Sequence, residues 1–164
     1  MLVRELMTIY PVYIYEDSDI RHAAEVISLA EISEIMVVDT AHNLIGVVAE
    51  GDLLRRILPD VEEIIAAGGT LNHAFTLFVE KGAQLAGDLI SHLIIRDPIS
   101  VKPNDEVAQV ATLMLQKQIR RLPVVDGNNK LVGSISRSDI CRAVIYNPTL
   151  GGKIAEKDSL RSGI

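Results

Sequence analysis

Hydrophobic and polar positions follow helical and strand periodicities along the chain, and the same order of these periodicities occurs twice. Apolar side chains recur at helical spacing at Ile20, Ala23, Ala24 and Ile27, and again at Val107, Val110, Ala111 and Met114. Each predicted helix follows a short extended run after a proline, at 12–15 and 99–102. Two β-branched runs joined by a polar turn come next, at 35–38 with 44–48 and at 122–125 with 131–135. A second helix begins near residue 50 or 137, so each half predicts a β-α-β-β-α unit.

The two halves are copies of each other. Residues 11–57 align with residues 98–144 without a gap at an offset of 87, with ten identical pairs in 47 positions. The shared residues include Val-Val-Asp at 37–39 and 124–126 and the Asp-x-x-Arg at 52–55 and 139–142. Such self-similarity indicates a duplicated structural unit.

One unit leaves an apolar sheet face that needs a cover, and the second copy can supply it. We therefore expect an α/β (α+β) fold in which two repeats, 1–58 and 89–146, pack with pseudo-twofold symmetry, followed by a frayed tail at 147–164. Residues 59–88 predict inserted helices. Their apolar face, formed by Leu71, Phe75, Phe78 and Val79, either adds to the core or forms an interface with another subunit. For the first helix of repeat one, Asp17 or Ser18 is the expected cap.

Composition and charge narrow the class of protein. Sixteen Lys and Arg against 22 Asp and Glu give a net charge of −6, which disfavours general binding to nucleic acid. No apolar run approaches the roughly 20 residues of a membrane span, and Arg4 and Glu5 stand where a signal peptide would begin its apolar segment. The single Cys141 excludes a disulfide framework. We expect a cytoplasmic protein without membrane or nucleic-acid partners.

Several segments resemble the cystathionine-β-synthase (CBS) domain, which occurs in tandem pairs. They are LMTIYPVYI at 6–14, SEIMVVD and RRLPVVD, and LIGVVAEGDLLRR and LVGSISRSDICR. The resemblance implies sheet-to-sheet packing of the repeats, a homodimer, and clefts that bind AMP, ADP, ATP or S-adenosylmethionine. It also implies a regulatory role toward a partner protein that the sequence does not identify.

The ligand signature of that family, Gly-x-x-Ser/Thr-x-x-Asp, is complete in repeat two at Gly133, Ser136 and Asp139. The resemblance implies that Ser136 and Asp139 hold the ribose or phosphate of a ligand. The same two residues fit a capping box, in which the serine caps the helix and the aspartate bonds back. Both interpretations stay open.

Repeat one departs from the signature. Asp52 is present, but Ala49 replaces the hydroxyl, and Glu50 would repel a phosphate. Residues 2–57 carry four basic and ten acidic side chains, whereas residues 89–144 carry eight and five. We therefore expect the ligand mainly at repeat two.

The arginines of repeat two are candidate phosphate contacts, because guanidinium groups match phosphate oxygens. They are Arg120, Arg121, Arg137 and Arg142. The alternative is a solvated basic face, or ion pairs with the acidic repeat. By the family's geometry, Ile99 and Ser100 line the adenine, and Thr8, Val12 and Tyr13 hold related places in repeat one. Tyr13 either stacks on a base or packs within the fold.

We expect a regulatory module that senses an adenosine compound, mainly at repeat two, and signals by conformational change. The alternative is a ligand-free scaffold for dimerisation or protein interaction. The sequence contains no nucleophile–base pair, metal-ligand spacing or phosphate-loop motif, so we expect neither an enzyme nor a resident cofactor.

Overall fold

The computed structural model describes residues 1–146, and its contacts divide the chain into two compact units. One contains Met1–Pro11 and the chain from Ile99 onward, and the other contains Val12–Pro98. We name them the Asp139 unit and the Asp52 unit. Their limits differ from the expected ranges 1–58, 59–88 and 89–146, because the start of repeat one lies with repeat two. The tail expected at 147–164 lies outside the described residues.

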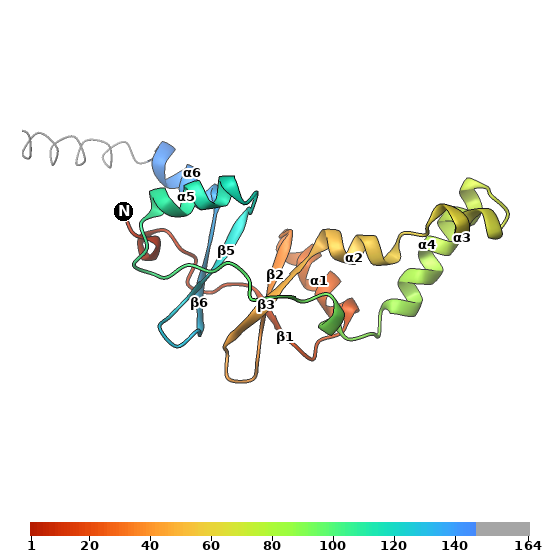
Figure 1. The fold of residues 1–164 in the computed structure, drawn as a ribbon, viewed down its shortest axis with the longest axis horizontal. Coiled ribbons are helices and arrows are strands. Elements are labelled where there is room, and N and C mark those ends of the chain that lie inside the picture. Colours follow the sequence, from red (N-terminus) through yellow and green to blue (C-terminus); the bar gives the residue numbers. More distant parts are fainter. Residues whose placement is uncertain (147–164) are drawn as a thin grey trace, which may run out of the picture. The chain divides into compact units, whose positions relative to one another are not determined.

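The Asp52 unit is built on a four-stranded sheet of order β1-β2-β3-β4 (Figure 1). β1 is parallel to β2, and the other neighbours are antiparallel. Its elements are β1 (Tyr13–Tyr15), α1 (Ile20–Ala30), β2 (Glu34–Val38), β3 (Leu44–Ala49), α2 (Glu50–Ile57), α3 (Val61–Ala66), α4 (Leu71–Leu85), a 3-10 turn (Ile90–His92) and β4 (Ile95–Arg96).

The core of the Asp52 unit joins one face of the sheet to α1. Its buried residues are Ile14, Ala23, Ile27, Ile35, Val37, Val48, Ile90 and Leu93. The cap of α1 is Asp19, whose side chain accepts a hydrogen bond of 2.7 Å from the His22 amide, so the expectation of Asp17 or Ser18 is wrong by one or two residues. A cap at Asp19 satisfies an otherwise unpaired amide of the first turn.

The Asp139 unit contains α5 (Val107–Gln116), β5 (Arg121–Val125), β6 (Leu131–Ser136), α6 (Arg137–Tyr146) and a 3-10 turn (Val3–Glu5). β5 and β6 form an antiparallel hairpin. Val101 pairs in parallel with Val124 on one side of it, and Thr8 pairs antiparallel with Ser134 on the other. The core residues are Val3, Val101, Val110, Met114, Leu122, Val124 and Ile135.

The repeats exchange their first segments. Thr8 of repeat one pairs with Ser134 of repeat two, and Ile95, which lies 87 residues after Thr8, pairs with Val47 of repeat one. Because Val47 and Ser134 are also 87 residues apart, the two pairings are equivalent. The expected α/β fold of two repeats with inserted helices is confirmed.

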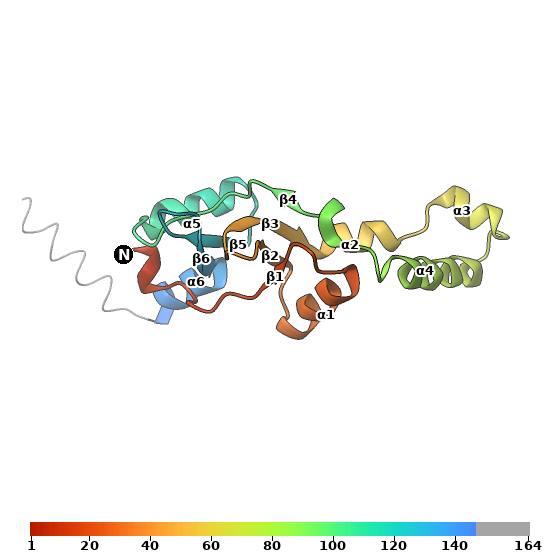
Figure 2. The same ribbon diagram turned by 90° about the horizontal axis from the view of Figure 1, so that it is seen from below.

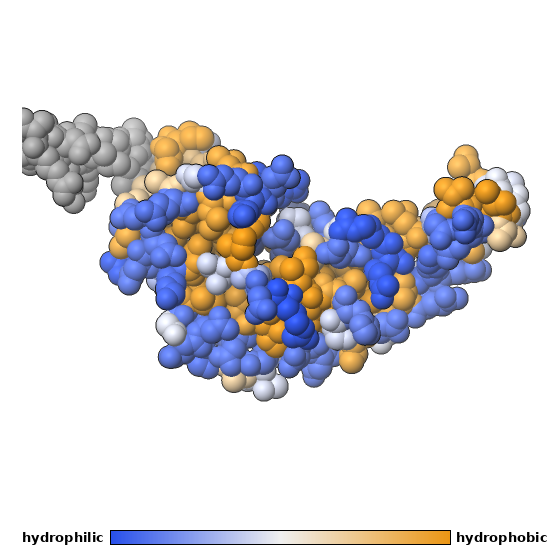
Figure 3. All heavy atoms as spheres, in the orientation of Figure 1, coloured by the Kyte–Doolittle hydropathy of each residue, from blue (hydrophilic) through white to orange (hydrophobic). Residues whose placement is uncertain are grey.

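The inserted helices α3 and α4 lie side by side beyond the end of α2 (Figures 1 and 2). Neither contains a buried residue, so the interpretation of this segment as added core packing is wrong. Leu71 is 91% exposed and Phe75 is 65% exposed, and Figure 3 shows hydrophobic atoms gathered over these helices. Polar contacts join the pair, since Lys81 Nζ donates to Glu63 Oε2 over 2.8 Å. This bond lowers the pKa of the Glu63 carboxyl from its usual value.

Candidate functional site

Ser136 and Asp139 form a complete capping box at the start of α6. The Ser136 amide and hydroxyl both donate to Asp139 Oδ2, over 2.8 and 2.6 Å, and the Asp139 amide donates to Ser136 Oγ over 3.1 Å. The structure therefore contains the cap that the sequence allowed. Asp139 Oδ1 makes no bond within the cap and lies 3.9 Å from Arg142. A contact to that oxygen would leave the three hydrogen bonds of the cap in place.

Gly133 allows the N-terminal segment to approach β6 closely. A Cβ atom at Gly133 would lie 2.8 Å from the Thr8 carbonyl oxygen and 3.0 Å from Met7 Sδ. At the equivalent Gly46, a Cβ would overlap the Ile95 carbonyl oxygen and Ile94 Cγ2. The glycine of the signature is thus required by backbone approach. It places the exposed Thr8 in the same unit as Ser136 and Asp139, although Thr8 belongs to repeat one.

Three of the four candidate arginines have contacts within the Asp139 unit. Arg137 donates from Nε to the Ile119 carbonyl over 2.8 Å and from Nη2 to the Met114 carbonyl over 2.7 Å, which ties the start of α6 to the last turn of α5 and to the segment after it. These two bonds anchor the Arg137 guanidinium to backbone carbonyls through Nε and Nη2. Arg121 donates to Ser134 Oγ over 3.1 Å, and Arg142 pairs with Asp139, while Arg120 is exposed.

Ile99 and Ser100 directly precede Val101, which pairs with β5. Both are exposed, Ile99 by 38%. They belong to the Asp139 unit, so the structure groups them with Ser136, Asp139 and Thr8. Tyr13 lies in the Asp52 unit, where its ring makes edge contacts with Tyr15 at 5.7 Å and with His42 at 4.7 Å between centroids.

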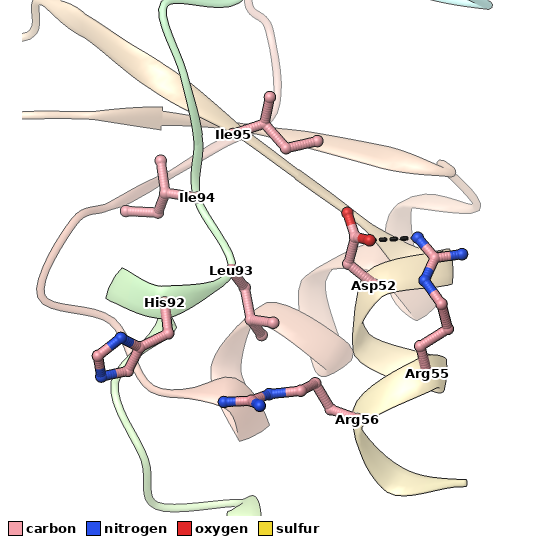
Figure 4. A pocket seen from close by; sticks show the side chains of 7 residues that line it. All are labelled: Asp52, Arg55, Arg56, His92, Leu93, Ile94 and Ile95. Carbon is pink, nitrogen blue, oxygen red and sulfur yellow. Dashed lines mark hydrogen bonds and ion pairs between the residues drawn. The ribbon is translucent and has the colours of Figure 1, made fainter.

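The Asp52 unit contains a pocket of about 580 Å³ next to its aspartate (Figure 4). The lining residues are Asp52, Arg55, Arg56, His92, Leu93, Ile94 and Ile95. The start of α2 has no side-chain cap, because Ala49 stands in the place of Ser136. Asp52 instead forms an ion pair with Arg55. Figure 4 shows Arg55 turned toward Asp52, whereas Arg56 points toward Leu93 and His92.

Sequence reasoning found Asp52 but missed the basic groups around it. The net acidity of repeat one concealed Arg55 and Arg56, which lie at its very end. His92 and Ile95 were missed because they belong to repeat two in sequence and reach this pocket of repeat one only through the exchanged segment. The alignment of the two repeats could have located Ile95, because Ile95 aligns at the offset of 87 with Thr8, which is a candidate ligand contact.

The family model of the CBS domain matches residues 3–59 and 86–146. The chain belongs to the CBS-domain family. The two matched ranges correspond to the two repeats, and the helices α3 and α4 lie in the segment between them.

Relatives of this CBS-domain chain include proteins of similar and of greater length. The uncharacterized protein MJ1426 of Methanocaldococcus jannaschii is 26% identical over 155 residues, which cover 88% of this chain and 92% of that protein. The chloroplastic CBS domain-containing protein CBSX2 of Arabidopsis thaliana is 28% identical over 135 residues. That match covers 75% of this chain and 54% of CBSX2, so the chain spans about half of that relative.

Solved structures of CBS pairs share the fold. CBSX2 in complex with AMP superposes with a TM-score of 0.67 at 24% identity, over 88% of this chain and 96% of that one. The CBS pair of MJ0100, in complex with 5′-methylthioadenosine and S-adenosyl-L-methionine, superposes with a TM-score of 0.62 at 22% identity, over 93% and 98%. Within residues 1–146, no helix is long and apolar enough to cross a membrane.

Proposed function

We propose that this CBS pair is a regulatory module that binds an adenosine compound, mainly through Asp139 in repeat two, and passes the signal on by a conformational change. The observation that carries the proposal is the hydrogen bonding of the Asp139 carboxylate. Its Oδ2 is fixed by the cap of α6, while its Oδ1 lies outside the cap. A carboxylate held in one orientation is a preorganised acceptor for a pair of ribose hydroxyl groups.

The neighbourhood of Asp139 supports the same ligand class. Thr8 adds a hydroxyl at the edge of β6, and Arg142 and Arg120 bring exposed positive charge to the same unit. Ile99 and Ser100 supply an apolar and a polar contact beside β5. Similar proteins bind adenosine compounds, since CBSX2 was solved with AMP and MJ0100 with S-adenosyl-L-methionine. A change in the relative arrangement of the repeats on binding would carry the signal to a partner protein.

The test is calorimetric titration with AMP, ADP, ATP and S-adenosylmethionine, for the wild type and for Asp139→Asn. Asparagine keeps an oxygen that can accept from the Ser136 amide, so the cap survives while the charge is lost. We expect at least one compound to bind the wild type, and Asp139→Asn to weaken it by about tenfold, which is the loss of one charged hydrogen bond.

Ser138→Ala is the matched control, because Ser138 lies within the signature and is exposed. We expect it to bind like the wild type. Unchanged affinity in Asp139→Asn would refute the assignment of the main site to Asp139, and the absence of binding by all four compounds would refute the nucleotide function.

A second candidate function, a ligand-free dimerisation scaffold, is favoured by the exposed apolar side chains of α3 and α4. The occupant of this face would be a second copy of the chain, as the family resemblance implies a homodimer. Light scattering of Leu71→Ser/Phe75→Ser decides between the functions. A monomeric mass for this variant beside a dimeric wild type, together with no nucleotide binding, would favour the scaffold.

A further inference from the structure

Two hollows of the Asp52 unit share one arginine in their linings. The pocket of about 580 Å³ beside Asp52 and a hollow of about 280 Å³ beside α4 are both lined by Arg56. The other residues of the smaller hollow are Lys81, Gln84 and Leu85, all from α4. Arg56 therefore connects the signature aspartate of repeat one to the inserted helix. Glu50, the side chain expected to repel a phosphate, lines neither hollow.

Arg56 is the positive group of this region that no carboxylate neutralises within residues 1–146. Arg55 is paired with Asp52, and Lys81 Nζ is shared by Glu63 Oε1 and Oε2 at 3.0 and 2.8 Å. The exposed guanidinium of Arg56 has no hydrogen bond or ion pair among the described residues. The imidazole of His92, on the same side of the pocket, is a second group that can donate a hydrogen bond to an anion (Figure 4).

Among the described residues, the Asp139 unit has no counterpart to Arg56 and His92. At the offset of 87, Ala143 occupies the place of Arg56 and Glu5 that of His92. The family match stops at residue 59 and resumes at residue 86, so Lys81 and Gln84 lie outside it.

We propose that the Asp52 unit binds a polyphosphate chain, such as that of a nucleoside triphosphate, which passes Arg56 and reaches α4 at Lys81 and Gln84. Binding of the nucleoside part of such a ligand rests on the proposed function, whereas binding of the phosphate part is argued from Arg56 and from the residues of α4 that share its hollow. A monophosphate would fill only the pocket beside Asp52. A longer phosphate chain would touch α4, so the insert would distinguish ligands by phosphate number.

The experiment is calorimetric titration with tripolyphosphate, ATP and AMP in an Asp139→Asn background, so that the Asp52 unit dominates the signal. Arg56→Gln should weaken tripolyphosphate and ATP by about tenfold and AMP by much less. Gln84→Glu, which adds a negative charge on exposed α4, should weaken ATP by about threefold and leave AMP unchanged. Arg21→Gln is the charge-matched control, because exposed Arg21 lines neither hollow.

Three results would overturn the inference: no binding of tripolyphosphate, equal behaviour of Arg56→Gln and Arg21→Gln, or equal effects of Gln84→Glu on ATP and AMP. If tripolyphosphate does not bind and Arg56→Gln behaves like Arg21→Gln, while AMP and ATP bind at Asp139, the proposed function stands and this inference fails. If tripolyphosphate binding depends on Arg56 while no adenosine compound binds either unit, the polyphosphate site is supported and the proposed nucleotide function fails.

Discussion

Ser136 and Asp139 bond to each other in both directions across the first turn of α6. The serine hydroxyl donates to the aspartate Oδ2 over 2.6 Å and accepts from the aspartate amide over 3.1 Å. The same two side chains that a ligand would contact thus stabilise the helix. Loss of ligand binding in a variant of either residue therefore has to be separated from loss of the cap.

Removal of the serine hydroxyl should destabilise the protein by itself. Ser136→Ala deletes both hydroxyl bonds of the cap, and we expect a loss of about 1 kcal/mol in the free energy of unfolding. This corresponds to a drop of roughly 2–4 °C in melting temperature for a chain of this size. Calorimetric melting without ligand measures it. Ser138→Ala, the neighbouring control, should melt like the wild type, and an equal drop in both variants would contradict the prediction.

The missing cap of α2 can be supplied by substitution. Ala49 occupies the N-cap position with extended backbone, three residues before Asp52. Ala49→Ser should therefore recreate the capping box of repeat two and raise the free energy of unfolding by about 0.5–1 kcal/mol. The double variant Ala49→Ser/Asp52→Asn tests the partnership. A gain of the same size without the aspartate carboxylate would show that serine acts alone.

The close approach at Gly133 should be intolerant of a side chain. Gly133→Ala forces the Thr8 carbonyl or Met7 away from β6, and we expect a cost of about 1–3 kcal/mol in denaturant unfolding. Gly127→Ala is the matched control, because a Cβ there meets no atom within 4 Å. We expect that control to stay within about 0.5 kcal/mol of the wild type. Tolerance of Gly133→Ala would mean that Thr8 is not held as described.

Arg137 should matter more for stability than for ligand binding. Its two bonds to the Ile119 and Met114 carbonyls tie α6 to the end region of α5, and Arg137→Gln should cost about 1.5–3 kcal/mol. Exposed Arg120 provides the comparison, since Arg120→Gln should leave the melting temperature within about 1 °C. Binding of the compound found by titration is measured for both. A strong loss of affinity in Arg137→Gln without destabilisation would contradict this prediction and would support Arg137 as a phosphate contact.

The contact between α3 and α4 should weaken in acid. The hydrogen bond from Lys81 lowers the pKa of Glu63, so the contact is fully present above the usual carboxyl pKa and is lost as the pH falls through the lowered value. Amide NMR shifts of α3 and α4, followed from neutral pH downward, should move in that acidic range. Glu63→Gln should show the weakened contact already at neutral pH and no such step. A step that persists in this variant would assign it to another carboxylate.

Local patterns in the sequence determined the elements of both repeats. Helical spacing placed Ala23 and Ile27 on the inner face of α1, and Val110 and Met114 on that of α5, because burial follows the period of the helix. The signature also located Ser136 and Asp139, and the capping interpretation of their spacing is visible in the structure. These features depend on residues that are close in sequence.

Tertiary structure decided what distant residues do. Thr8 pairs with Ser134, and Ile95 pairs with Val47, because Gly133 and Gly46 allow a neighbouring backbone to approach closely. No local sequence pattern predicts which segment of the chain occupies that position. Arg137 bonds to the Met114 and Ile119 carbonyls because folding brings the start of α6 beside the end of α5, although these residues are far apart in sequence. Repeat one has an acidic composition, yet its pocket gathers Arg55, Arg56 and His92. Composition counts charges along the chain, whereas only folding determines which of them surround a common space.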